Sequence, residues 1–150
     1  VYYSSIQDAA PFGNDEGSDA LWELSDLLRR RPKADLTNYP ASLLMKLYHL
    51  PFCPPKGETK EELEAQRGIT LGDRDTLEQL RRTDRVIVAL ALAQVKITGE
   101  LSKQLYELAL RSLERLGKLK SIGVTVRCSV ELLAEERSDL ETYARSVPLV

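Results

Sequence analysis

The sequence predicts an all-α fold, a single-domain irregular helical bundle around a central apolar helix at about residues 84–98. Three observations support this: apolar residues recur three or four positions apart, helix-capping residues precede several of these segments, and Val86–Ile97 is apolar nearly all round. With 150 residues, 43% of them hydrophobic and 29% charged, the chain is long enough to bury a core. Because neither a fixed repeat nor a clear linker occurs, we expect one domain, 1–150.

The first 17 residues are expected to form an N-terminal loop or arm, because they are rich in Gly, Pro, Asp and Asn and have no apolar period. A helix should follow, with Ser18 as its N-cap. Leu24 and Leu28 belong to its apolar face, and three arginines followed by Pro32 mark its end.

Two shorter helices are predicted next. One opens near Pro40, whose fixed φ suits a first turn, and ends before Pro51. Residues 51–55 include three prolines and should form a rigid loop. The second helix starts at a capping box formed by Thr59 and Glu62.

The pattern of the central segment fits two types of secondary structure. A short helix with Leu77 and Leu80 is expected after the turn at residues 72–73. The following run, Val86–Ile97, has a length that suits a buried strand as well as a buried helix. Three alanines and a candidate acidic cap at Asp84 favour a helix, which ends in a turn at residues 98–100.

Two further helices are predicted in the last third. Ser102 should cap one that places Leu105 and Leu116 inward and ends with Gly117 at its C′ position. Residues 124–126 are β-branched and are expected to be extended. From about Ser129 the pattern is again helical.

Charge and composition narrow the classes of partner. The 21 basic and 23 acidic residues give a net charge of -2, so no global field attracts nucleic acid or an anionic membrane. The most apolar run is shorter than the ~20 residues of a membrane span.

Val1–Ala10 has no signal-peptide pattern, although a chain that begins at Val1 without Met fits a processed or trimmed form. The two cysteines fit a reducing compartment, and we expect a cytoplasmic protein.

Residues with catalytic or metal-binding chemistry are few. His49 is the single histidine, and Pro51 separates it from Cys53, so we interpret it as a residue at a helix C-terminus. Cys53 and Cys128 are expected to be free thiols, with one disulfide as the alternative. The sequence has no paired C-x-x-C and no phosphate loop, and its Asn14–Asp19 acids fail the EF-hand spacing. We therefore predict no catalytic residue, no metal and no cofactor.

The most distinctive segment is Ala10–Trp22. Its structural interpretation is that Phe12 packs on Trp22 while polar residues bond the exposed amides of a helix. Its functional interpretation is a rigid aromatic surface rimmed by acids, suited to a basic protein partner. The candidate partner-binding residues are Phe12, Asn14, Asp15, Glu16, Asp19 and Trp22.

This segment, together with 88–99 and 105–115, resembles the two signatures of the YfeS-like proteins, a group of uncharacterised helical bacterial proteins. The first signature is a Pro-Phe-Gly-Asn-Asp-x-Gly run that enters a helix, and the second is apolar and helical. The loop at 51–55 and the segment 124–128 depart from that pattern. The resemblance implies an all-α bacterial cytosolic protein and assigns no catalytic residue.

Two functional hypotheses follow. The first is a non-catalytic interaction domain, of immunity or adaptor type, in which the Asn14–Asp19 acids and the Glu58–Glu64 face meet a basic protein. The second is a hydrolase or small-molecule-binding enzyme that uses carboxylates in a pocket between helices. That alternative predicts a cavity with convergent acids and at least one carboxyl group of raised pKa.

Overall fold

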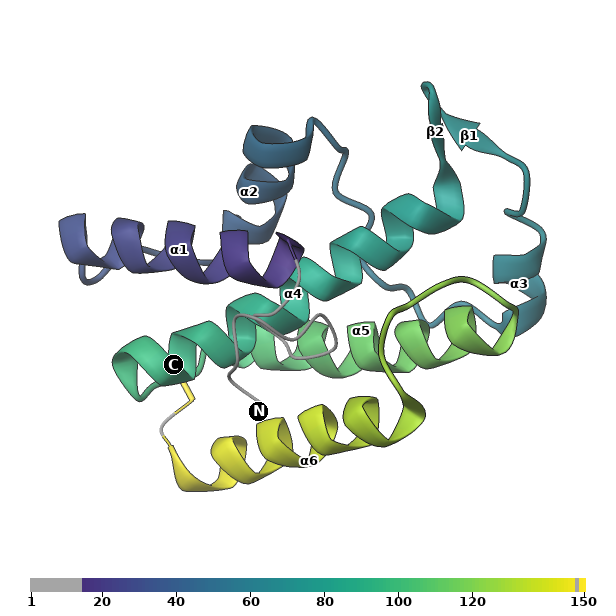
Figure 1. Cartoon of the computed structure of the whole chain (residues 1–150). Helices are drawn as coiled ribbons and strands as arrows, with labels where there is room; N and C mark the ends of the chain where they lie inside the picture. Colours follow the sequence, from purple (N-terminus) through teal and green to yellow (C-terminus); the bar gives the residue numbers. More distant parts are fainter. Residues whose placement is uncertain (1–14, 148) are drawn as a thin grey trace.

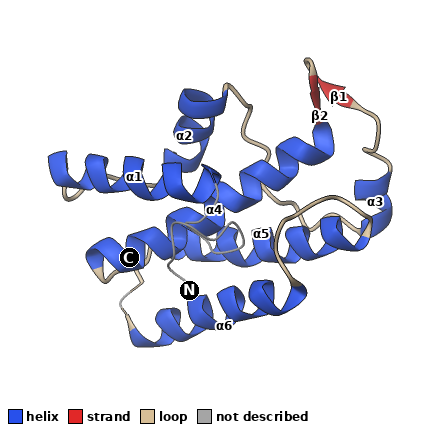
Figure 2. Ribbon diagram, in the orientation of Figure 1, coloured by secondary structure: helices blue, strands red, loops and turns tan. Residues whose placement is uncertain are grey.

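The computed structural model describes residues 15–147 and 149–150, and it confirms the all-α prediction. Its elements in chain order are α1 (Asp15–Arg30), α2 (Tyr39–Tyr48), α3 (Lys60–Glu64), β1 (Thr70–Leu71), β2 (Arg74–Asp75), α4 (Thr76–Thr98), α5 (Lys103–Ser121) and α6 (Val130–Ser146) (Figures 1 and 2). The two short strands pair antiparallel across the turn at residues 72–73. A strand pair at that turn was not expected.

Helix α4 is the centre of the bundle. It contacts α1 and α2 on one side and α5 and α6 on the other, while the hairpin and α3 lie at the end where α4 begins (Figure 1). Its apolar stretch from Val86 to Ala93 is at most 1% exposed, so the predicted central helix is confirmed. The apolar pattern runs all round the helix because neighbours cover every side.

The start of α4 differs from the prediction. The helix begins at Thr76, with Asp75 as its N-cap accepting from the Glu78 N–H, so the separate short helix around Leu77 and Leu80 is its first part. Asp84 is therefore not a cap. It lies inside the helix with 0% exposure, because an arginine on α5 supplies its hydrogen bonds.

Capping residues predicted three of the six helix starts in the described part of the chain. Thr59, Ser102 and Ser129 each accept a hydrogen bond from an N–H in the first turn of α3, α5 and α6. The prediction for Ser18 was wrong, because α1 already begins at Asp15. The prediction for Gly117 was also wrong, because α5 continues past it to Ser121.

Three smaller predictions concern loops and cysteines. His49 is the C-cap of α2 in a left-handed conformation with φ of 54°, which agrees with its predicted place at a helix C-terminus. Cys53 and Cys128 are not joined by a disulfide bond. Residues 124–126 form a loop between α5 and α6 and take no part in a strand.

Candidate functional site

Three of the six candidate residues of the N-terminal segment have described side chains, and these do not share one degree of exposure. Phe12 and Asn14 lie outside the described residues, as does the side chain of Asp15, which begins α1. Glu16 is 6% exposed and Trp22 is 66% exposed, although both lie on α1. The segment therefore has an inward part, which holds helices together, and an outward part.

The inward part is an ion-pair cluster between α1 and α4. Glu16 Oε1 accepts from Arg81 Nη2 at 2.9 Å and from Arg82 Nε at 3.1 Å. Burial alone would raise the pKa of Glu16, but the charge of Arg81, a backbone N–H and Arg82 together hold that pKa below its ordinary value. Glu16 is therefore an ionised anchor for the start of α1.

Asp19 extends this cluster to α2. The Tyr48 hydroxyl donates to Asp19 Oδ2 at 2.8 Å, and the Arg82 guanidinium lies 4.9 Å from the centre of the Tyr48 ring. Burial and the Asp19 carboxylate raise the pKa of Tyr48, which keeps its proton on the shared hydrogen bond. The start of α1, the end of α2 and α4 are thus joined by one set of polar contacts.

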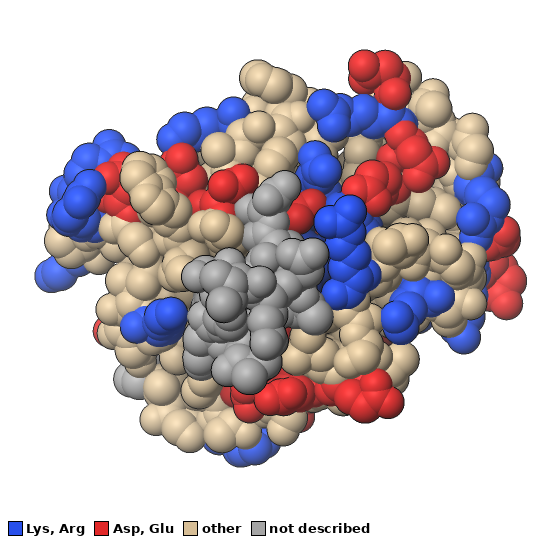
Figure 3. Space-filling model, in the orientation of Figure 1, with Lys and Arg blue, Asp and Glu red and all other residues tan. Residues whose placement is uncertain are grey.

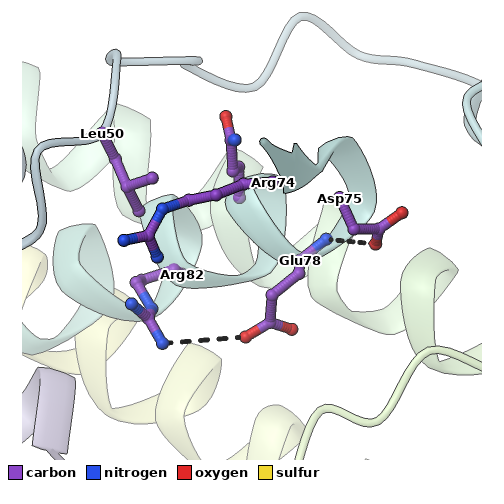
Figure 4. Close-up of a pocket in the computed structure, with 6 residues that line it drawn as sticks. Leu50, Arg74, Asp75, Glu78 and Arg82 are labelled. Carbon is purple, nitrogen blue, oxygen red and sulfur yellow. Dashed lines mark hydrogen bonds and ion pairs between the residues drawn. The ribbon is translucent and has the colours of Figure 1, made fainter. Parts of the chain in front are cut away.

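A small pocket of about 160 Å³ lies beside this cluster, between Leu50 and the first turns of α4 (Figure 4). Its two carboxylates are already engaged: Asp75 accepts from the Glu78 N–H, and Glu78 pairs with Arg81 at 2.5 Å and with Arg82 at 3.9 Å. This pocket therefore offers no unpaired acid for general acid–base chemistry.

A second polar centre surrounds Arg115 on α5, which is 2% exposed. Its guanidinium donates to both oxygens of Asp84 at 2.9 and 2.8 Å, to the carbonyl oxygens of Cys53 and Pro54 at 2.7 and 3.3 Å, and to Glu58 at 3.0 Å. An arginine has five N–H donors, so all of them are used. Arg115 fixes the proline-rich loop against α4 and α5.

That loop forms one wall of a cleft of about 360 Å³, which we call the loop cleft. Its other walls are α3, the β1–β2 hairpin and the first two turns of α4, with Arg115 at the α5 side. Leu63 and Leu80 contribute apolar surface, and Thr76 a hydroxyl. Its volume falls within the range of ligand pockets, about 300–1,000 Å³.

The carboxyl groups of raised pKa are not the ones that line these cavities. Burial raises the pKa of Asp84 to about 7 against the opposing effect of Arg115, and burial also raises the pKa of Glu136. The loop cleft is lined instead by Glu58 and Glu62. Backbone N–H groups and Arg115 hold the pKa of Glu58 low despite its partial burial. The two features that the enzyme hypothesis requires therefore occur in different places.

Metal-binding groups give no alternative centre. Within residues 15–147 and 149–150, no three His, Cys, Asp or Glu side chains are arranged to hold a metal ion. His49 is exposed at the end of α2, and Cys128 is buried beside Glu136.

The outward part of the N-terminal segment is one stripe along α1. Ser18, Trp22, Ser25 and Arg29 follow one another at intervals of three or four residues and are all exposed. We call this stripe the Trp22 face. Figure 3 shows basic side chains gathered at the far end of α1, where Arg29 and Arg30 lie.

The residues that sequence reasoning missed are the inward arginines. Arg81 and Arg115 are 7% and 2% exposed, and Arg82 is half-buried. Each arginine lies within a segment of mixed apolar and charged residues, and a charged side chain that is turned inward needs a partner. The sequence did not show which residue each arginine would pair with.

Comparison with known proteins confirms the predicted resemblance. The chain is similar to the protein named "Uncharacterized protein YfeS" of Escherichia coli (strain K12), with 27% identity over 115 residues. The match covers 77% of this chain and 45% of that protein, so the chain spans less than half the length of this relative. No family model and no solved structure matches the chain. None of the described helices has the length and apolar character required to cross a membrane.

Proposed function

We propose that this protein is a non-catalytic interaction domain, of immunity or adaptor type, that binds a basic protein partner through the Trp22 face. The observation that carries this proposal is Trp22, which is 66% exposed on a helix whose other large apolar residues are buried or half-buried. Tryptophan is among the residues that contribute most to protein interfaces, because it buries a large rigid surface at low entropic cost.

The neighbours of Trp22 suit such an anchor. Ser18 and Ser25 lie one turn before and after it on the same stripe, so small side chains leave the indole open to a partner. An anchor that stands above small polar residues fits the pattern of a central contact surrounded by a hydrated rim.

Acidic side chains beside this stripe favour a basic partner. Glu23 pairs with Lys46 at 2.7 Å, and Asp26 pairs with Arg29 and Arg30. In each pair the cation is the exposed member, with 62–76% of its side chain exposed against 15–21% for the carboxylate, so a basic partner must displace these cations to reach the acids. Binding should then weaken as salt rises, with screening over about 10 Å at 0.1 M.

Photo-crosslinking tests this proposal. A photoreactive amino acid replaces Ser25 on the Trp22 face, and in a second sample it replaces Ser138, which is exposed on α6. We expect a salt-sensitive adduct with a single basic protein from native lysate at position 25 and none at position 138.

Two substitutions provide matched controls. Trp22→Ala should abolish the adduct, whereas Val130→Ala removes an apolar side chain that is 62% exposed on α6 and should leave it unchanged. Both variants should keep the wild-type melting temperature. An adduct that survives Trp22→Ala, or a captured protein that is not basic, contradicts the proposal.

A further inference from the structure

The pocket between Leu50 and the first turns of α4 is lined by two arginines that come from different elements. Arg74 belongs to β2 and Arg82 to α4. Figure 4 shows both guanidinium groups on the side of Leu50, whereas the carboxyl group of Asp75 points the opposite way. We call this place the Arg74 pocket. Two like charges that line one pocket repel each other, and an anion bound between them relieves that repulsion.

Arg82 is held in position and still has donors to offer. Its Nε donates to Glu16 at 3.1 Å, and its guanidinium lies 4.9 Å from the centre of the Tyr48 ring. Its Nη2 is 3.9 Å from Glu78 Oε1, which is too long for a hydrogen bond. Within the described part of the chain, Nη1 and Nη2 therefore donate to no acceptor. Because 26% of this side chain is exposed, a ligand can contact these two nitrogens without any change of the fold.

Arg74 has an unengaged guanidinium. The residue is exposed on the β1–β2 hairpin, and no hydrogen bond or ion pair joins its side chain to another residue of the described chain. All five N–H donors of this side chain are therefore open to a ligand. Together the two arginines offer an acceptor-rich ligand several accessible donors on one side of the pocket.

The nearby carboxylates have partners of their own, and this sets the charge that the pocket can take. Glu78 accepts two hydrogen bonds from Arg81, at 2.9 and 2.5 Å, and Glu16 is shared by Arg81 and Arg82. Of the two cations that line the pocket, Arg74 is the one without a carboxylate partner among the described residues. One unpaired positive charge suits one negative charge. A carboxylate matches this charge and the planar fork of a guanidinium, whereas a phosphate dianion brings a second charge that no cation of the lining balances.

We propose that the Arg74 pocket binds the carboxylate of a small organic acid, which accepts hydrogen bonds from Arg74 and from the Nη1 and Nη2 groups of Arg82. The pocket volume of about 160 Å³ suits an acid of a few carbon atoms, since pockets for drug-sized ligands begin at about 300 Å³. This inference goes beyond the proposed function, because no residue of the Trp22 face lines the pocket.

An NMR titration with acetate and acetamide tests this inference. The two molecules have nearly the same shape, but only acetate is charged at pH 8. Sodium chloride keeps the ionic strength constant, so that general screening does not change during the titration. We expect acetate to shift the amide signals of Leu50 and Arg74 with a saturable curve and a Kd in the millimolar range, on the order of the affinity of a small fragment. Acetamide should cause no saturable shift, and equal binding of the two probes overturns the inference.

Arg74→Gln should weaken acetate binding about fivefold, the upper end of the range for an exposed ion pair. Arg111→Gln is the matched control, because Arg111 is exposed on α5, does not line this pocket and carries the same charge. This variant should bind acetate as the wild type does. If both variants weaken binding equally, acetate responds only to the net charge of the protein, and the assigned site is wrong.

Inorganic phosphate is the third probe, and at pH 8 it is mostly doubly charged. At the same ionic strength we expect it to bind more weakly than acetate, because its second charge has no partner in the lining. Phosphate that binds more tightly than acetate, and that loses affinity in Arg74→Gln, would overturn the assignment to a carboxylate.

Discussion

Arg115 and Asp84 form a bidentate pair between α5 and α4, with N–H···O distances of 2.9 and 2.8 Å and exposures of 2% and 0%. The remaining donors of Arg115 hold the loop carbonyl groups of Cys53 and Pro54 and the carboxylate of Glu58. One side chain thus joins two helices to a proline-rich loop that cannot form a regular ladder of its own.

Arg115→Lys should therefore be strongly destabilising although it keeps the charge. An ammonium has three donors and no planar fork, so at least two of the five acceptors lose their partner. We expect the free energy of unfolding to fall by about 3–5 kcal/mol, the range for breaking a buried pair. Urea denaturation measures this change.

Arg111→Lys is the matched control, because Arg111 is exposed on the same helix. Its effect should stay within about 0.5 kcal/mol, as for most surface substitutions. If Arg115→Lys changes stability no more than Arg111→Lys does, the loop is held by other contacts.

Local rules predicted the helices well because they depend on residues close in sequence. Thr59, Ser102 and Ser129 act as caps through hydrogen bonds that span three residues, and such bonds can be read directly from the chain. The left-handed Gly99 at the end of α4 is equally local.

The polar centres were not predictable in the same way. Asp84 and Arg115 are 31 residues apart, and Glu16 and Arg81 are 65 apart. In sequence Asp84 looks like a cap, since an acid before an apolar run usually is one. Only the packing of α5 on α4 gives that acid a partner. Packing also accounts for the extension of α4 back to Thr76, because Arg81 in its second turn pairs with Glu16 of α1.

Glu16→Gln should change how stability depends on acid. The folded-state pKa of Glu16 lies below its ordinary value of 4.5, so its ion pairs stabilise the fold fully above about pH 4.5. This contribution is lost as the pH falls through the folded-state pKa. We expect the variant to be less stable than the wild type at pH 7 and to approach it under strongly acidic conditions, where Glu16 of the wild type is protonated.

Melting temperatures between acid and neutral pH test this prediction, with Glu131→Gln as the control. Glu131 is exposed in the first turn of α6, so its replacement removes a carboxylate without breaking a buried ion pair. A difference between Glu16→Gln and the wild type that stays constant down to the lowest pH would show that Glu16 is not the titrating group.

Thr83→Val should stabilise the protein. The Thr83 hydroxyl is fully buried in α4 and contacts no partner, so the isosteric methyl group removes a desolvation cost without leaving a cavity. We expect a gain of about 1 kcal/mol in the free energy of unfolding. Thr98→Val gives the contrast, because the Thr98 hydroxyl donates to the Gln94 carbonyl at 2.7 Å and accepts from the Glu100 N–H. That variant should lose stability, and the same sign for both variants would contradict the argument.

The two thiols should differ in reactivity. Cys128 is 3% exposed, and its Sγ donates to Glu136 Oε1 at 3.6 Å. Burial, aided by the Glu136 charge, raises the pKa of Cys128 to about 11, so at pH 8 only about one molecule in a thousand carries the thiolate there. Cys53 is half-buried beside the loop cleft.

A thiol reagent at pH 8 should therefore modify Cys53 in the native protein and Cys128 only at the rate of unfolding. Cys53→Ser should remove the native reaction and Cys128→Ser should preserve it. Rapid modification of native Cys53→Ser would mean that α6 opens away from α4 and α5 without global unfolding.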